Sequence, residues 1–159
     1  MFRSVLPTLG NFNKFNKLNR LNCKFYRNIS TFTINKYTES IVEKEDYPLD
    51  RCRNILDNKT IGVLGYGPQG QSQALNLRDN GFDVIVGTRK KNQDSKALND
   101  CWVEDKTLFS IEETVERSDI LMYLLSDVGQ MLQWPNILPR LKENQTLYFS
   151  HGFGVVYND

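Results

Sequence analysis

Acidic residues are missing from the first 38 positions, and the first of them is Glu39. The same segment carries seven lysines and arginines and many asparagines. A basic, acid-free amino terminus is typical of a mitochondrial transit peptide. We therefore predict that residues 1–38 are a disordered transit peptide, cut near Ile29, that directs the protein to the mitochondrial matrix. A plastid-type peptide shares this composition, and an asparagine-rich tail produced by biased base composition is the alternative.

Cysteine and histidine are also scarce. The chain has three scattered cysteines, no CxxC pair and a single histidine, which argues against a thiolate zinc site or a disulfide framework. No apolar run reaches the roughly 18 residues of a membrane span. The net charge is only +1, so nothing favours nucleic acid or an anionic membrane as a partner.

Short apolar runs alternate with helical patterns after a polar lead-in at residues 39–58, which has a short helix around 49–56. A capping box at Ser110 and Glu113 opens one helix, and Trp134-Pro135 interrupts another. Strands are expected at 60–64, 83–87, 120–125 and 146–150, and helices at 69–80, 95–100, 111–117, 127–132 and 137–142. This order predicts an α/β fold with a doubly wound parallel sheet (Rossmann-type) over residues 59–159. The domain is expected to be incomplete, because only the beginning of its second half is present.

A glycine-rich turn follows the first of these strands and opens a helix. It matches G-x-G-x-x-G and reads Gly65-Tyr66-Gly67-Pro68-Gln69-Gly70. Gly65 allows the tight turn, Gly67 lets the backbone approach a pyrophosphate, and Gly70 permits close packing of helix on strand. Pro68 removes one N–H donor but suits the first turn of a helix. The context favours a dinucleotide site over a plain glycine turn.

The end of the next strand indicates which dinucleotide is bound. Sites for NAD usually place an acid there to hold the ribose 2′-hydroxyl. This chain has Arg89, Lys90 and Lys91 instead, and Arg89 could hold a 2′-phosphate bidentately. Ser95 could donate to the same phosphate, whereas Asp94 is an unfavourable neighbour. We predict NADPH as the cofactor, with a solvated basic loop as the alternative.

Two later strands end in polar residues. In such folds, ligands lie outside the carboxyl ends of strands, near the point where the strand order reverses. Ser126, Asp127 and Gln130 are therefore placed to line the nicotinamide ribose, although Asp127 could instead cap the next helix. His151 follows the last strand and is a candidate catalytic residue, with a structural role as an equal alternative.

These residues resemble one family, the ketol-acid reductoisomerases, also called acetohydroxyacid isomeroreductases. The resemblance runs from about residue 61 to residue 159, and residues 42–48 resemble the lead-in of the fungal mitochondrial members. Its strongest segments are 65–70, 75–81, 125–127 and 147–153.

The resemblance implies an enzyme of valine and isoleucine synthesis. With Mg²⁺ it would shift an alkyl group in 2-acetolactate or 2-aceto-2-hydroxybutyrate, and then reduce the product with NADPH to a 2,3-dihydroxy acid. Residues 66–69, Arg89 and residues 127–130 would bind NADPH, and His151 would be the active-site histidine. The Mg²⁺ carboxylates would lie in a later helical domain that is absent here, so we expect the chain alone to be inactive. The complete enzyme is expected to be a homo-oligomer.

The sequence departs from the family pattern in two places. Pro68 stands where the turn more often has serine, and the loop after Arg89 lacks the usual serine spacing, which leaves the role of Ser95 open. The competing interpretations are another NADP-dependent Rossmann reductase and a short, non-enzymatic NADPH-binding protein.

Overall fold

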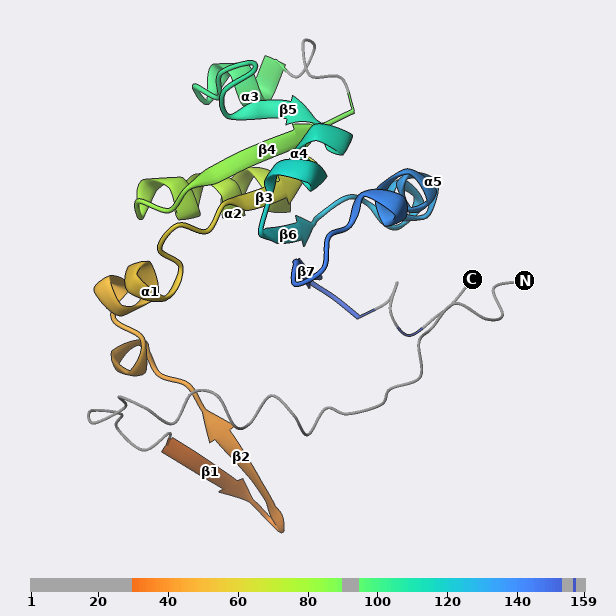
Figure 1. The fold of residues 1–159 in the computed structure, drawn as a ribbon. Coiled ribbons are helices and arrows are strands. Elements are labelled where there is room, and N and C mark those ends of the chain that lie inside the picture. Colours follow the sequence, from red (N-terminus) through yellow and green to blue (C-terminus); the bar gives the residue numbers. More distant parts are fainter. Residues whose placement is uncertain (1–29, 90–94, 153–155, 157–159) are drawn as a thin grey trace. The chain divides into compact units, whose positions relative to one another are not determined.

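The computed structural model describes residues 30–89, 95–152 and 156 (Figure 1). The chain divides into two units, Met1–Cys52 and Arg53–Asp159. The division falls inside the polar segment 39–58 that the sequence predicted to be a lead-in. Within the described residues, no helix is long and apolar enough to cross a membrane.

The described part of the first unit begins with an antiparallel hairpin. Strand β1 (Ser30–Ile34) pairs with β2 (Tyr37–Ile41), and Ile34 lies opposite Tyr37. Asn35, in the two-residue turn, has φ +56°, which suits asparagine at a tight hairpin turn. The prediction of disorder is therefore wrong for residues 30–38, because their β-branched and aromatic side chains favour strands. The remainder of the predicted transit peptide lies outside the described residues.

A short 3-10 helix and an α-helix follow the hairpin. The 3-10 helix η2 (Lys44–Asp46) has a capping box between Glu43 and Asp46. Helix α1 (Leu49–Ile55) confirms the short helix predicted around residues 49–56.

The second unit is built on a five-stranded sheet whose paired neighbours are all parallel. The order β5-β4-β3-β6-β7 puts β3 at the centre. The strands are β3 (Ile61–Leu64), β4 (Val84–Thr88), β5 (Leu108–Ser110), β6 (Ile120–Tyr123) and β7 (Thr146–Tyr148). Four of them were predicted. Strand β5 was missed because three residues give too short a pattern, and it is a strand through its pairing with residues 86–88 of β4.

Helices cover both faces of this sheet, which confirms the predicted doubly wound fold. They are α2 (Pro68–Asp79), α3 (Ser95–Asn99), α4 (Ile111–Arg117) and α5 (Asp127–Ile137), followed by the 3-10 helix η4 (Leu138–Arg140). Ala74 of α2 and Ala97 of α3 share one core cluster with Val63. Val115 of α4 and Ile137 of α5 belong to the cluster on the other face.

Helix α4 begins with the predicted capping box. The Glu113 N–H donates to Ser110 Oγ at 3.2 Å, and Glu113 Oε2 accepts the Ser110 N–H at 3.1 Å. Two N–H groups that the first helical turn leaves without partners are thereby satisfied.

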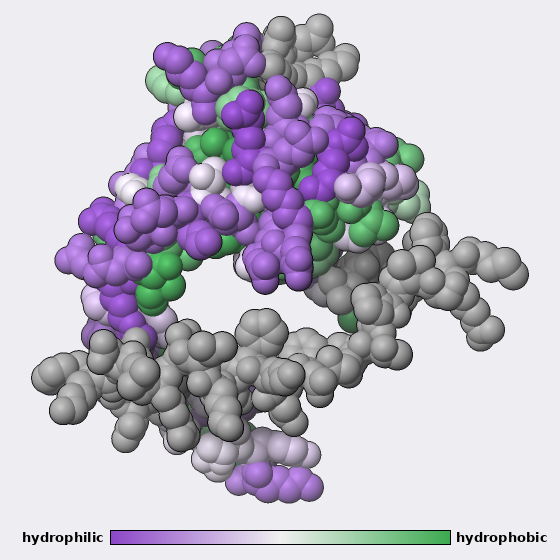
Figure 2. All heavy atoms as spheres, in the orientation of Figure 1, coloured by the Kyte–Doolittle hydropathy of each residue, from purple (hydrophilic) through white to green (hydrophobic). Residues whose placement is uncertain are grey.

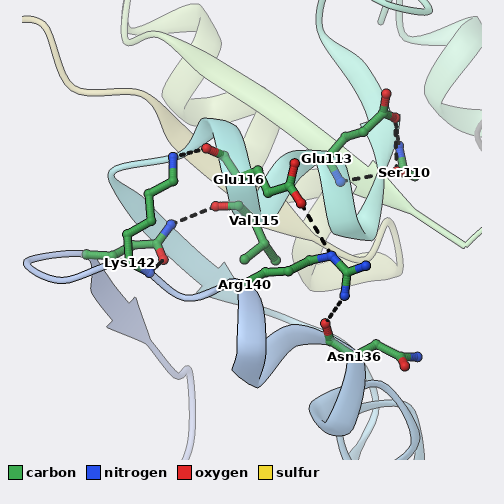
Figure 3. A network of polar contacts seen from close by, with 8 residues as sticks. Ser110, Glu113, Val115, Glu116, Asn136, Arg140 and Lys142 are labelled. Atoms are coloured by element: carbon green, nitrogen blue, oxygen red, sulfur yellow. Dashed lines mark hydrogen bonds and ion pairs between the residues drawn. The ribbon is translucent and has the colours of Figure 1, made fainter.

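The carboxyl end of α4 fixes the segment that leads into β7 (Figure 3). The side-chain amide of Gln145 donates to the carbonyl oxygens of Val115 and Ser118, at 2.8 and 2.7 Å. Lys142 donates to the carbonyl oxygen of Glu116, whose carboxylate lies 3.4 Å from Arg140 Nε. These bonds satisfy carbonyls at a helix end and anchor the chain just before β7.

Helix α5 continues through Pro135, although the sequence predicted an interruption there. Proline lacks an N–H, and inside a helix it typically costs about 3 kcal/mol. Here tertiary packing opposes that cost. Ile137 is completely buried, and the Trp134 ring lies 6.0 Å from that of Tyr123. The helix also keeps apolar surface exposed at Val128 and Leu132, and Figure 2 shows hydrophobic atoms over this region.

Candidate dinucleotide-binding site

The glycine turn and the predicted polar residues meet where the strand order reverses. Strand β3 pairs with β4 on one side and with β6 on the other, so the connections leaving β3 and β6 diverge. The two connections touch. A Cβ on Gly65 would lie 2.9 Å from Leu125 Cδ2 and 3.2 Å from the Leu124 carbonyl oxygen. This edge of the sheet is therefore the place for a ligand in a doubly wound fold.

The three glycines of the turn have different surroundings. Gly65 has φ +98°, a conformation that side chains rarely adopt. A Cβ on Gly70 would lie 2.1 Å from the Gly65 carbonyl oxygen, whereas a Cβ on Gly67 would meet no atom of the described residues within 4 Å. Gly65 and Gly70 thus serve the packing of the turn, as predicted. The exposed backbone of Gly67 borders open space, which fits the approach of a phosphate.

The beginning of α2 suits an anion. Gly67 is the N-cap and supplies no side-chain hydrogen bond, and Pro68 occupies the first turn. The first backbone bond of the helix runs from the Gln71 N–H to the Gly67 carbonyl oxygen at 2.8 Å. The N–H groups of Gln69 and Gly70 therefore have no partner within the helix. These donors and the helix dipole fit a pyrophosphate.

Tyr66 does not face this open side. The residue is 7% exposed, its hydroxyl donates to Asp100 Oδ2 at 2.8 Å, and the hydroxyl oxygen accepts the Trp102 indole N–H at 2.6 Å. Burial, together with the hydrogen bond to Asp100, raises the pKa of Tyr66. Of this predicted site residue, only the backbone remains available to a cofactor.

The predicted 2′-phosphate residues lie around the end of β4. Arg89 is exposed directly after this strand. Lys90 lies outside the described residues, and Ser95 begins α3, with a side chain that is not described. Sequence reasoning missed Thr88, which precedes Arg89. Its buried hydroxyl has no hydrogen-bond partner among the described residues. Nothing in the sequence pattern marks a threonine at the end of a buried strand as a site residue.

Asp127 and His151, predicted separately, are brought together. His151 Nε2 lies 3.5 Å from Asp127 Oδ1, and both side chains are about half exposed. The alternative that Asp127 caps the following helix is wrong, because the N-cap is Ser126, whose Oγ accepts the Gly129 N–H at 3.3 Å. The carboxylate of Asp127 therefore faces the imidazole that follows β7.

Gln130 braces the loop after β6. Its side-chain amide donates to the Leu125 carbonyl oxygen at 2.9 Å, and its own backbone carbonyl accepts the Tyr123 hydroxyl at 2.6 Å. Its side-chain N–H group is thus engaged within the protein. Gln73 of α2 similarly donates to Ser150 Oγ at 3.2 Å and reaches the residue before His151.

Residues 55–159 match the family model described as "Acetohydroxy acid isomeroreductase, NADPH-binding domain". The chain belongs to this family. Its resemblance to the ketol-acid reductoisomerases and its Rossmann-type fold are thereby confirmed, as is its assignment to a family of enzymes. Membership decides against a reductase of another family, and the description of the domain supports a nicotinamide cofactor.

Relatives and a solved structure agree with this assignment. The chain is 47% identical over 130 residues to "Ketol-acid reductoisomerase (NAD(+))" of Desulfosudis oleivorans, covering 81% of this chain and 37% of that protein. It is 42% identical over 134 residues to "Ketol-acid reductoisomerase, mitochondrial" of Neurospora crassa, covering 84% and 33%. The structure of an NADH-preferring ketol-acid reductoisomerase from an uncultured archean matches with a TM-score of 0.60 and 35% identity, covering 74% of this chain and 35% of that one. The chain thus spans about a third of the length of these relatives.

Proposed function

We propose that this protein acts as a ketol-acid reductoisomerase and that residues 59–159 hold its NADPH. The proposed reaction isomerises 2-acetolactate or 2-aceto-2-hydroxybutyrate and reduces the product to a 2,3-dihydroxy acid, in valine and isoleucine synthesis. The observation that carries the proposal is that, in a domain of this family, the Gly67 turn and the Asp127–His151 pair lie at the carboxyl ends of strands of one sheet. The test is NADPH oxidation by the native protein with either ketol acid.

The residues of the turn would bind the pyrophosphate. The N–H groups of Gln69 and Gly70 would donate to its oxygens, and the absence of a Cβ on Gly67 leaves room for it. Arg89 would pair with the 2′-phosphate. When bound, NADPH supplies the hydride for the reduction. These contacts orient the cofactor, and Tyr66 supports the turn from inside the core.

We further propose that NADPH is preferred over NADH. Support comes from Arg89, Lys90 and Lys91 and from the absence of an acid at the end of β4. Asp94 opposes the preference, and two similar proteins carry names that specify NAD(+) or NADH. Titration of the protein with NADPH and with NADH tests the proposal. Tighter binding of NADH would contradict it.

His151 and Asp127 would act where the nicotinamide reaches the substrate. The Asp127 carboxylate would orient the imidazole through Nε2, and the imidazole would hold a proton close to the oxygen of the carbonyl that is reduced. In the native protein, His151→Gln should lower kcat strongly while NADPH still binds. Asp127→Asn should lower kcat less. Unchanged kcat in both variants would remove the pair from the mechanism.

A magnesium site is not supported within the described residues, where no three His, Cys, Asp or Glu side chains gather as possible metal ligands. The Mg²⁺ that we expect for the isomerisation would need ligands from elsewhere, and we derive no step through it. The purified 159-residue chain should accordingly bind NADPH without converting 2-acetolactate. Turnover by that chain would refute this expectation.

We also propose that residues 1–38 direct the protein to the mitochondrial matrix, and that the active enzyme is a homo-oligomer. The basic, acid-free segment supports the first point, as do fungal relatives whose names include "mitochondrial". Import into isolated mitochondria, followed by amino-terminal sequencing, tests it. Cleavage near Ile29 is the expected result. The mass of the native protein in solution tests the oligomer.

A further inference from the structure

Asp100, directly after α3, gathers hydrogen bonds from the glycine turn and from α2. Its Oδ2 atom accepts the Tyr66 hydroxyl at 2.8 Å and the Gln71 side-chain amide at 2.7 Å. Its backbone carbonyl accepts Arg78 Nη1 at 2.6 Å. Gln71 and Arg78 lie two helical turns apart and so project from the same side of α2. One residue thereby holds the turn and the helix that follows it.

Trp102 holds Tyr66 from a second direction. Its indole N–H donates to the Tyr66 hydroxyl at 2.6 Å, and the two rings meet edge to face with centroids 6.3 Å apart. The Arg78 guanidinium lies 4.7 Å from the centroid of the Trp102 ring. Cys101, between Asp100 and Trp102, has φ +65°, and this local bend accompanies the convergence of both side chains on Tyr66.

Among the described residues, the ligand side of the turn has no comparable support. Gly67 follows Tyr66 directly and has open space above it, and α2 begins without a side-chain cap. The backbone N–H groups that would face a pyrophosphate are therefore positioned from the protein side of the turn, by the hydrogen bonds of Tyr66 and Gln71. Both end on the same oxygen of Asp100.

We propose that Asp100 is a positioning residue that holds the glycine turn in the geometry that binds the dinucleotide pyrophosphate. This inference rests on the proposed binding of a nicotinamide dinucleotide. Asp100 also ties the turn to α3, the helix that follows the connection after Arg89.

The protonation states suit this arrangement. The hydrogen bonds from Gln71 and then Tyr66 lower the pKa of Asp100, so the carboxylate stays charged at neutral pH. Burial raises the pKa of Tyr66, so its hydroxyl remains a donor. Asparagine at position 100 would keep one oxygen that can accept the hydrogen bonds from both Tyr66 and Gln71. Alanine would remove the acceptor, and phenylalanine at position 66 would remove one donor.

The test is the Kd for NADPH of the full chain and its variants, measured by fluorescence titration together with thermal unfolding. Asp100→Ala should raise Kd about tenfold and Tyr66→Phe about threefold, since bonds to a charged acceptor are lost. Asp100→Asn should stay within about twofold of the unsubstituted chain. The matched control is Asp119→Ala, which removes a carboxylate that accepts the Thr60 N–H at 2.9 Å at the opposite end of the strands. It should change Tm without changing Kd.

The outcomes distinguish failure of the proposed dinucleotide binding from failure of the positioning role of Asp100. If the unsubstituted chain binds neither NADPH nor NADH, the proposed function fails and this inference fails with it. If that chain binds but Asp100→Ala and Tyr66→Phe bind equally well, only the positioning role fails. Failure of Asp100→Asn to retain binding would also count against it. If Asp100→Ala does not fold, Tyr66→Phe and Asp100→Asn decide the question.

Discussion

Two alanine substitutions in the glycine turn should affect different properties: Gly67→Ala should weaken NADPH binding, and Gly70→Ala should lower the stability of the fold. At Gly67 the backbone has φ −76° and ψ −175°, which alanine adopts readily, and a Cβ would meet no described atom within 4 Å. At Gly70 a Cβ would lie 2.1 Å from the Gly65 carbonyl oxygen. The same change in side chain therefore enters open space at one position and a backbone atom at the other.

For Gly67→Ala we expect the free energy of unfolding to change by no more than about 0.5 kcal/mol. The poorer N-cap and the reduced entropy of the unfolded chain act in opposite directions. The new methyl group would occupy the space proposed for the pyrophosphate. The Kd for NADPH should therefore rise at least about tenfold, which corresponds to roughly 1.4 kcal/mol.

For Gly70→Ala we expect a loss of stability even without cofactor. Backbone must move to relieve the contact, and overpacking of this kind typically costs about 1–3 kcal/mol. The higher helix propensity of alanine returns up to about 1 kcal/mol. A net loss of about 1–2 kcal/mol should lower Tm by roughly 4–8 °C for a domain near 100 residues.

Thermal unfolding without ligand and titration with NADPH measure both effects in the same samples. Gly67→Ala serves as the control for Gly70→Ala in the unfolding measurement. If Gly70→Ala still folds and binds NADPH, it serves in turn as the control for Gly67→Ala in the binding measurement. Unaltered NADPH binding by Gly67→Ala would show that the pyrophosphate lies elsewhere. An unaltered Tm for Gly70→Ala would refute the packing argument.

Three other substitutions test separate features. Arg89→Ala should raise the Kd for NADPH about tenfold and leave that for NADH unchanged; equal losses would contradict the 2′-phosphate role. Gln145→Ala leaves two carbonyls without their donor and should lower the free energy of unfolding by about 1–3 kcal/mol in urea titrations. Burial raises the pKa of Tyr123 to about 12 from 10.0, so the folded state retains a proton that the unfolded state loses. Stability should then fall as pH rises from 10 to 12, by up to roughly 2–3 kcal/mol, and Tyr123→Phe should reduce that slope.

Local signals in the sequence were enough for most of the sheet and for the glycine turn. The apolar run before Gly65 and the helical pattern after Gly70 are both short-range, and the capping box at Ser110 needs only Glu113 to form. Features that depend on distant packing were missed. Strand β5 exists through its pairing with β4, and α5 passes Pro135 because Ile137 is buried.

For the candidate site, too, the sequence predicted some features and missed others. The residue types at Gly67, Arg89 and His151 predicted a shared edge of the sheet, and all three lie after carboxyl ends of its strands, because parallel strands end together. The direction of each side chain could not be read from the pattern. Tyr66 points into the core and Gln130 braces a loop, since partners far away in sequence or on the backbone satisfy them.

The central position of β3 also bears on the order of folding. Its pairing with β4 joins residues 61 and 84, whereas its pairing with β6 joins residues 61 and 120. The longer loop closes at a greater entropic cost, so the β3–β6 pairing should form late. The edge that carries both the glycine turn and Asp127 is complete only after that step. A dinucleotide that contacts both sides would bind only chains that have finished it, and at high concentration would draw the folding equilibrium toward them.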